Sequence, residues 1–230
     1  MVTYEHVKVA KFIDRPNRFI AHVDLDGEKL TVHVKNTGRC KEILVPGTEV
    51  ILSESDNPDR KTKYDLIAGY KGELLINIDS QAPNPAFKEF IPKCGLFGSD
   101  PIIHSEFTHG DSRFDFFIED GDRKIFVEVK GVTLEENGIC RFPDAPTERG
   151  LKHLRGLMAA LDEGYECYVA LIVQMKGMHY FIPNYETHEE FGIVLEEAHR
   201  KGVGILVYDC IVTPDSMTVD SPIPFRFRDS

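Results

Sequence analysis

Three charged residues near the middle of the chain have the types and spacing that metal-dependent phosphodiester chemistry requires. Asp115 lies in the segment SRFDF, and Glu128 and Lys130 form a Glu-x-Lys triplet a short distance downstream. Carboxylates suit Mg²⁺ or Mn²⁺, which prefer oxygen donors, and an oxygen-rich site does not suit zinc. A bound divalent cation lowers the pKa of water and stabilises charge on a phosphate, and a nearby lysine can orient that water. The three residues are therefore candidate catalytic groups, with both carboxylates as metal ligands.

The surrounding sequence predicts how these residues are positioned. Asp120-Gly121 separates two stretches rich in β-branched and aromatic residues, which predicts a hairpin. Side chains alternate between the two faces of a strand, so Glu128 and Lys130 share a face. Asp115 lies on the partner strand and meets Glu128 if the register allows. The alternative is a chance pattern of charges on a strand, because Glu-x-Lys by itself is common.

Two further charged residues precede Asp115. Glu106 is either a third acidic metal ligand or an ordinary surface glutamate. Arg113, two positions before Asp115, is a candidate contact to a phosphate of bound nucleic acid.

A cationic helix follows the triplet. Thr147 is a suitable N-cap for a helix that runs to about Glu163. Arg149 and His153 are four residues apart and share a face of that helix, and Lys152 lies beside them. Cationic groups near a helix N-terminus form a reasonable phosphate site. The alternative is a solvated basic face.

A second cationic segment lies in the N-terminal part, in the stretch KNTGRCK. Asn36 is suited to hydrogen-bond a base or sugar, while Arg39 and Lys41 are suited to contact phosphates. Arg18 adds basic character next to Phe19, and aromatic side chains on a barrel face can stack on bases. The alternative for the aromatic residues of this region is a place in the core.

The elements expected around these residues form two groups. Strands are predicted at 7–13, 18–25, 29–34, 49–53, 65–70 and 73–77, with Asp26-Gly27 as a hairpin turn. Short strands with little helix suggest a small barrel of the OB type. The segment QAPNP then marks a boundary, which divides the chain into a barrel at 1–82, expected to bind nucleic acid, and an α/β domain at 83–230.

The second domain is expected to contain a central mixed sheet. Strands at 113–118, 124–133, 166–173 and 203–209 alternate with helices. Besides the helix capped by Thr147, a capping box formed by Thr187 and Glu190 predicts a helix that ends at Gly202.

Composition limits the possible classes of protein. Residues 1–90 carry 13 basic and 14 acidic side chains, whereas residues 91–230 carry 14 and 24, so the acidic excess lies in the second part. DNA responds to local potential, so the first part can still present a basic face. Five cysteines without paired spacing, and no signal or membrane-spanning segment, indicate a cytoplasmic protein without a membrane partner. Phosphate-binding loops, dinucleotide fingerprints and serine-hydrolase elbows are absent from the sequence.

Several stretches together resemble the sugar fermentation stimulation protein A (SfsA) family. They are RFIAHV at 18–23, HVKNTGRCKEILVPG at 33–47, SRFDF at 112–116, FVEVKGVTL at 126–134 and FPDAPTERGLKHLRGL at 142–157. The resemblance covers most of the chain, and its last two stretches are highly specific.

The resemblance implies a fold, a partner and a set of site residues. The fold is an N-terminal OB-like domain joined to a C-terminal domain of the PD-(D/E)xK nuclease type. The partner is DNA, bound without sequence specificity, with a regulatory link to sugar (maltose) metabolism. The carried-over motif is Asp115, Glu128 and Lys130, with Glu106 as a further acid and Mg²⁺ or Mn²⁺ as the implied cation. The family's Asn-Thr-Gly-Arg stretch begins at Asn36.

Three hypotheses follow for function. The first is a non-specific DNA-binding protein with a regulatory role and a nuclease-like metal site. The second is an active Mg²⁺- or Mn²⁺-dependent nuclease acting on DNA or RNA. The third is a protein-interaction module with a vestigial site. The oligomeric state stays open, with a homodimer as one possibility.

Overall fold

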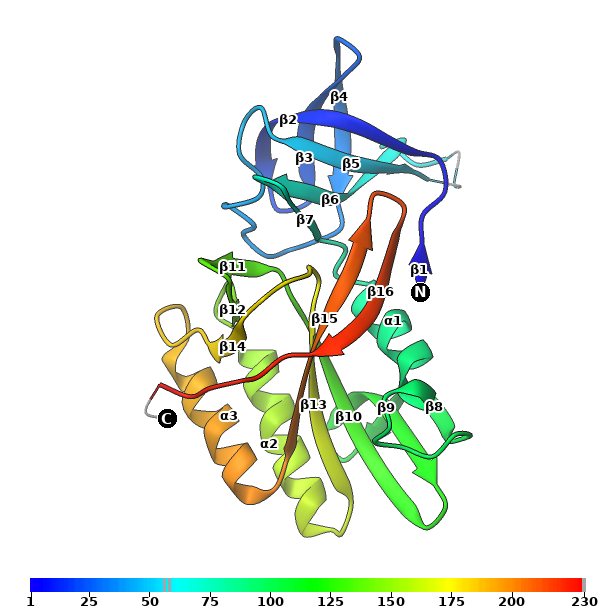
Figure 1. Ribbon diagram of the computed structural model, residues 1–230, viewed down its shortest axis with the longest axis vertical. Helices are drawn as coiled ribbons and strands as arrows, with labels where there is room; N and C mark the ends of the chain where they lie inside the picture. Colours follow the sequence, from blue (N-terminus) through cyan, green and yellow to red (C-terminus); the bar gives the residue numbers. More distant parts are fainter. Residues whose placement is uncertain (56, 58, 229–230) are drawn as a thin grey trace.

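The structure is a computed structural model that describes residues 1–55, 57 and 59–228. A small barrel lies above a layered sheet domain, and a hairpin of the lower domain reaches up to the barrel (Figure 1). No helix in the described part of the chain is long and apolar enough to span a bilayer.

The barrel forms from six short strands whose inward residues are apolar. They are β2 (Val7–Asn17), β3 (Ile20–Leu25), β4 (Glu28–Val34), β5 (Glu49–Glu54), β6 (Tyr64–Lys71) and β7 (Leu74–Asn77). Their order is β4-β3-β2-β5-β6-β7; a parallel pairing of β4 with β6 closes β2 to β6 into a barrel, and β7 pairs with β6 beside it. Asp26 and Gly27 both have positive φ angles, 56° and 88°, as a two-residue hairpin turn requires. The predicted strands and the OB-type barrel are confirmed.

The second domain is built on a seven-stranded mixed sheet. In spatial order its strands are β1 (Val2–Thr3), β16 (Ser216–Pro222), β15 (Gly204–Thr213), β13 (Glu166–Val173), β10 (Arg123–Val132), β9 (Ser112–Asp120) and β8 (Ile102–His109). Strands β10, β13 and β15 are parallel, and β9 and β10 form the predicted antiparallel hairpin. The mixed sheet is therefore confirmed. Strands β1, β8 and β16 extend it beyond the predicted set.

Helices cover both faces of this sheet. Helix α1 (Pro83–Phe90) packs on one face and continues into the short helix η1 (Ile91–Lys93). Helices α2 (Glu148–Asp162) and α3 (Glu189–Lys201) pack on the other face (Figure 1). Alternation along β10 sends Phe126 toward α2 and Val127 toward α1, so a run of apolar residues fills two cores.

The helix ends show two correct predictions and one correction. Thr147 caps α2, and its Oγ1 accepts a hydrogen bond from Gly150 N at 3.0 Å. Gly202 ends α3 with a φ of 119°, as expected. The capping box is wrong, because His188 is the N-cap of α3. Thr187 Oγ1 instead accepts a hydrogen bond from Asn184 Nδ2 at 2.8 Å.

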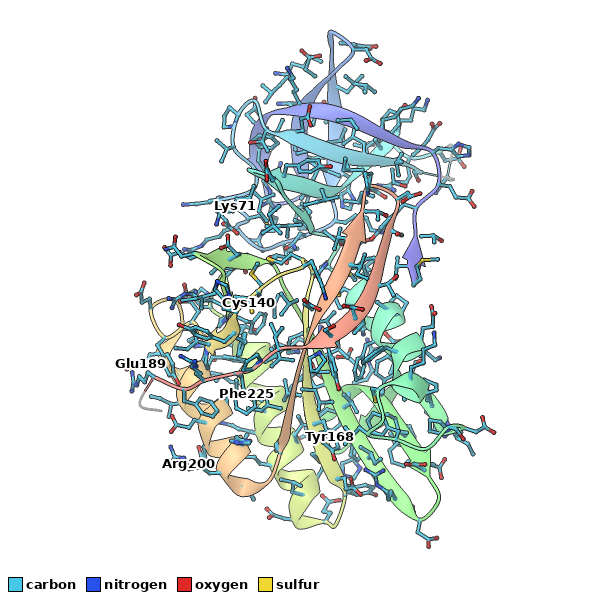
Figure 2. The ribbon with its side chains drawn as sticks, viewed as in Figure 1. Lys71, Cys140, Tyr168, Glu189, Arg200 and Phe225 are labelled. Carbon is cyan, nitrogen blue, oxygen red and sulfur yellow. The ribbon has the colours of Figure 1, made fainter. Side chains whose placement is uncertain are left out.

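A small sheet lies between the barrel and the main sheet. It contains β11 (Leu134–Glu136), β12 (Ile139–Phe142) and β14 (Tyr180–Pro183), none of which was predicted. Lys71, at the end of β6, donates a hydrogen bond to the Glu135 carbonyl oxygen at 2.6 Å and forms an ion pair with its side chain (Figure 2). At the other side, β1 leaves the barrel segment and pairs with β16. The two domains are thus joined by side-chain contacts and by a shared strand pairing.

Candidate functional site

The hairpin of β9 and β10 brings Asp115 and Glu128 together where the two strands separate. Their ladder ends at the Val127–Phe116 pair, one residue before both carboxylates. Asp115 is held by two hydrogen bonds: Oδ2 accepts from Val129 N at 2.7 Å, and Oδ1 accepts from Asn84 Nδ2 at 2.7 Å. Asn84 comes from α1, so three elements position this carboxylate.

Glu128 is almost fully buried, with 2% of its surface exposed. Its Oε1 contacts both Lys130 Nζ, from the same strand, and His153 Nδ1, from α2. Its Oε2 is buried and accepts no hydrogen bond from the described part of the chain. A buried carboxylate oxygen without a partner is costly, so this atom indicates a missing positively charged or donating group.

The pKa values of the two carboxyl groups are shifted in opposite directions. Burial raises the pKa of Asp115, and the neighbouring negative charge of Glu128 raises it further. Burial also acts to raise the pKa of Glu128, but Lys130 and His153 outweigh it and hold that pKa below its ordinary value. The ionised form is therefore favoured at Glu128 and disfavoured at Asp115, relative to ordinary carboxyl groups.

The donor chemistry of the pair fits a hard divalent cation. A cation placed between Asp115 and Glu128 would relieve the repulsion between them and supply the partner that Glu128 Oε2 lacks. Among the described residues, no group of three or more His, Cys, Asp or Glu side chains is arranged to hold a metal ion. A cation at this pair would thus keep several waters, which is usual for Mg²⁺ bound through one or two carboxylates.

Glu106 does not join this pair. It sits at an irregular point of β8 with a φ of 57°, between the pairs Ser105–Phe116 and Phe107–Phe114. Its side chain is exposed and lies 3.5 Å from Arg113, so each of these two residues has the other as its ion-pair partner. The pairs on both sides keep one register, so no residue is inserted in β8; the exposed side chain of Glu106 pairs with Arg113 and is not placed as a third ligand.

His153 also differs from its expected place. It is buried, and it contacts Glu128 rather than solvent. Arg149 Nε donates to His153 Nε2 at 3.4 Å, which confirms that these residues share a face of α2. The two ring nitrogens of His153 thus face different partners, Nδ1 facing Glu128 and Nε2 facing Arg149. His153 therefore holds Glu128 in position, while Arg149 and Lys152 remain exposed at the start of the helix.

The loop after β4 is shaped by internal hydrogen bonds. Arg15 donates to the carbonyl oxygens of Arg18, Asn36, Gly38 and Arg39. The Asn36 side chain is also used internally, because Nδ2 donates to Ile78 O at 2.9 Å and Oδ1 accepts from Gly38 N at 2.6 Å. Asn36 thus builds the loop, contrary to the expectation of a free side chain.

Three predicted cationic residues of the barrel remain exposed, namely Arg18, Arg39 and Lys41. The Arg39 guanidinium faces solvent, and the backbone of this residue is held by Arg15, which donates to its carbonyl oxygen, and by Asp144 Oδ2, which accepts from its N–H at 2.8 Å. Arg18 lies over the exposed ring of Phe19 at 5.8 Å from its centroid. Phe12, by contrast, is in the core. The barrel therefore presents a cationic surface with one aromatic ring.

A cavity of about 360 Å³ lies between the two domains. Its walls come from the loop after β4, the end of β10, and the segment that leads into α2. Asp144 and Thr147 line it from the second domain, and Arg18 and Gly38 line it from the barrel. Arg18 is the one exposed cation named above that lines this cavity, and Gly131, the residue after Lys130, lies in its wall.

Sequence reasoning missed three contributors to this region. The prolines of residues 81–85 predict a break, yet Asn84 lies in the first turn of α1 and its side chain donates a hydrogen bond to Asp115. The link from His153 to Glu128 carries no sequence signal, since 25 residues separate them. Gln174, at the end of β13, donates to Asn77 Oδ1 and Asp79 O across the domain boundary, each at 3.0 Å.

The chain is similar to known proteins along nearly its whole length. The family model described as the SfsA N-terminal OB domain matches residues 13–78, and the sugar fermentation stimulation protein RE domain matches residues 81–216. The sugar fermentation stimulation protein homolog of Desulfitobacterium hafniense is 56% identical over 93% of this chain and 93% of its own length. The homolog of Ruminiclostridium cellulolyticum is 51% identical over 97% and 99%.

A solved structure shows the same arrangement of domains. It is described as Pyrococcus furiosus SfsA in complex with Ca²⁺, and it covers 98% of each chain with a TM-score of 0.87 and 25% identity.

Proposed function

The chain belongs to the sugar fermentation stimulation protein (SfsA) family, and on this basis we propose that it is a sequence-non-specific DNA-binding protein with a divalent-cation site at Asp115 and Glu128. The observation that carries the cation site is the buried, unpartnered Oε2 of Glu128 beside a second carboxylate whose pKa is raised. The Ca²⁺ complex of the Pyrococcus furiosus relative supports an oxygen-ligand cation. The family name supports a regulatory role in sugar metabolism for the whole protein.

Exposed cations on both domains support DNA binding. Arg18, Arg39 and Lys41 come from the barrel, and Arg149 and Lys152 come from the first turns of α2. None of the carboxylate ion pairs within the described residues involves these five side chains. Unpaired surface cations from two domains are suited to neutralise successive phosphates without reading bases.

DNA affinity is therefore expected to fall steeply with salt, with a log–log slope close to the number of phosphates contacted. Arg39→Ala and Lys41→Ala are each expected to reduce that slope by about 1 and to weaken binding equally on unrelated sequences. Fluorescence anisotropy with labelled duplexes over a salt series measures both quantities. Lys124→Ala, an exposed cation at the far end of the β9–β10 hairpin, is the matched control and is expected to change nothing. A salt-independent affinity, or a loss confined to one sequence, would contradict the proposal.

Hydrolysis of phosphodiesters is the second candidate function, and the placement of Lys130 favours it. A divalent cation would supply positive charge to a phosphate and lower the pKa of a water. Lys130 uses one of its three N–H donors on Glu128, and its side chain is 17% exposed, so the other donors can reach a phosphate oxygen or a water. His153 keeps Glu128 in the orientation that Lys130 requires.

Purified protein is accordingly expected to nick DNA or RNA when Mn²⁺ is present and to lose this activity when a chelator is added. Single-stranded, duplex and branched substrates should be compared by gel electrophoresis, with protein of matched purity without metal as the control. If no substrate is cut at any Mn²⁺ concentration that saturates the protein, the site binds a cation without catalysing hydrolysis.

A further inference from the structure

The interdomain cavity has the size and the polarity of a small-ligand site. Its volume of about 360 Å³ lies at the lower end of the range of about 300–1,000 Å³ that such sites occupy. The barrel contributes Arg18 and Gly38, and the second domain contributes Gly131, Arg141 and Gln174. The cavity is therefore formed only when both domains are in place.

Gln174 presents a fixed hydrogen-bond acceptor to this cavity. It is 1% exposed, and its Nε2 donates to Asn77 Oδ1 and to Asp79 O. These two acceptors determine the orientation of the amide, so Oε1 lies on the side of Gly131. A Cβ atom at Gly131 would lie 2.4 Å from Oε1, which shows how closely this oxygen approaches the end of β10. Within the described chain, no donor reaches Oε1.

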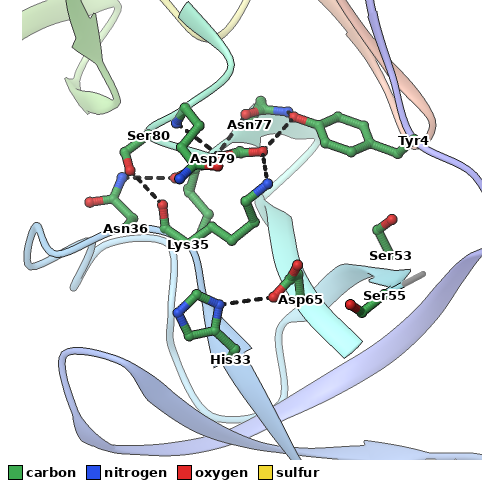
Figure 3. Close-up of polar contacts among 12 residues, drawn as sticks. Tyr4, His33, Lys35, Asn36, Ser53, Ser55, Asp65, Asn77, Asp79 and Ser80 are labelled. Carbon is green, nitrogen blue, oxygen red and sulfur yellow. Dashed lines mark hydrogen bonds and ion pairs between the residues drawn. The ribbon is translucent and has the colours of Figure 1, made fainter. Parts of the chain in front are cut away.

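The network behind Gln174 makes this orientation rigid. Asp79 pairs with Lys35 Nζ at 2.7 Å and accepts a hydrogen bond from Tyr4, and Asn77 Nδ2 donates to the Tyr4 hydroxyl at 3.0 Å (Figure 3). Since both carboxamide donors of Gln174 are occupied by this network, the residue cannot turn its amide group without breaking it. Its free oxygen is thus a preorganised acceptor.

Two guanidinium groups supply positive charge to the same cavity. Arg141 Nε is buried and makes no hydrogen bond to a described residue, and the Glu136 carboxylate lies 3.7 Å from it. Arg18 is exposed at the rim. The acidic residue of the wall, Asp144, already accepts from Arg39 N. The cavity therefore suits a ligand that carries an anionic group and an N–H or O–H donor.

The position of the cavity suggests what that ligand is. Gly131 follows Lys130 of the proposed cation site, and Thr147, another wall residue, caps the helix that carries His153. If a phosphate of a nucleic-acid strand contacted Lys130, the next nucleotide of that strand would lie at the cavity. A base paired in a duplex cannot enter such a space without being unpaired and unstacked, at a cost of a few kcal/mol.

We propose that the interdomain cavity binds a single unpaired nucleotide of a nucleic-acid strand, with a phosphate at Arg18 and Arg141 and a donor group at Gln174 Oε1. This inference rests on the proposed nucleic-acid function and adds a substrate class, namely single-stranded or frayed nucleic acid in preference to intact duplex.

The test compares three ligands at one salt concentration: a single-stranded oligonucleotide, a blunt duplex of the same sequence, and mixed nucleoside monophosphates. The variants are Arg141→Gln, which removes charge, and Gln174→Met, which removes the acceptor oxygen and keeps a side chain of similar length. Arg200→Gln, on the exposed surface of α3, is the matched control (Figure 2). Binding of Mn²⁺ and thermal unfolding are measured for every variant.

The wild-type protein is expected to bind the single strand at least about 10-fold more tightly than the duplex, and each cavity variant is expected to lose about 10-fold for the single strand alone. Mn²⁺ affinity should stay unchanged. Three results would each overturn the inference: equal affinity for single strand and duplex, an equal loss of affinity for single strand and duplex in the variants, or binding of free nucleotides without a preference for the single strand. If duplex and Mn²⁺ still bind in those cases, the proposed function survives; loss of all nucleic-acid and Mn²⁺ binding by the wild type refutes that function itself.

Discussion

Asp115→Asn is expected to remove divalent-cation binding while making the cation-free protein more stable at neutral pH. Asparagine keeps an acceptor oxygen for Val129 N, and the Asn84 amide can turn to offer its own oxygen to the new amide group. The substitution therefore removes one charge from a buried pair with little change in shape. Cation affinity should fall by more than about 100-fold, because one of only two carboxylate ligands is lost.

The gain in stability follows from the sign of the pKa shift. The pKa of Asp115 is raised in the folded protein by burial and by Glu128, so the folded state holds its proton more tightly than the unfolded state does. The free energy of unfolding therefore decreases as the pH rises from the unfolded pKa through the folded one. Above that pH window the wild-type protein is destabilised by the full free-energy cost of ionising Asp115 in the folded state. The asparagine variant has no such cost.

Thermal unfolding and calorimetric titration with Mn²⁺ between pH 5 and 8 measure both effects. Wild-type affinity for Mn²⁺ should decline as the pH falls toward the raised pKa of Asp115, since the ligand must be ionised. Asp111→Asn, an exposed neighbour outside the pair, is the control. Unchanged Mn²⁺ affinity, or a cation-free variant less stable than the wild type, would contradict the assignment of this carboxylate.

Lys130→Met is expected to destabilise the protein by about 3 kcal/mol, the cost usual for breaking a buried ion pair by removing one partner. Glu128 would then keep only His153 as a partner for its charge. Mn²⁺ should restore part of the loss, because a cation at the pair supplies the missing positive charge. Glu128→Gln combined with Lys130→Met should cost less than the sum of the single changes, because the two groups interact.

The stabilisation of the folded protein by Lys130 is expected to decrease as the pH falls. The pKa of Glu128 is lowered in the folded protein, so its ionised form stabilises the fold above the unfolded pKa, and this contribution disappears as the pH falls through the folded pKa. The difference between wild type and Lys130→Met should thus be largest at neutral pH and should shrink in acid. Urea denaturation at several pH values measures it, with Lys124→Met as the control. A difference that is constant with pH would mean that Lys130 acts only through packing.

Local sequence patterns predicted the helices, strands and turns whose formation depends on residues close together in the chain. Alternation of apolar residues indicated all six barrel strands, and Asp26-Gly27 indicated the turn between two of them. Thr147 indicated the start of α2, because its hydroxyl caps a backbone N–H only three residues away. The same reasoning misplaced the start of α3. There the Thr187 hydroxyl bonds to Asn184, a competing partner outside the helix.

The sequence by itself determined which charges lie at the end of the central hairpin, because the period of a strand places Glu128 and Lys130 on one face whatever surrounds them. The tertiary structure decided what those charges do. Packing of α2 on the sheet brings His153 to Glu128, packing of α1 brings Asn84 to Asp115, and Glu106 pairs with Arg113 at the surface.

The cavity between the domains was likewise decided only by tertiary structure, since it exists where the loop after β4 meets Gly131 and Gln174. Such contacts join residues far apart in the chain. They depend on how whole elements pack against one another, and no local period or spacing encodes that packing.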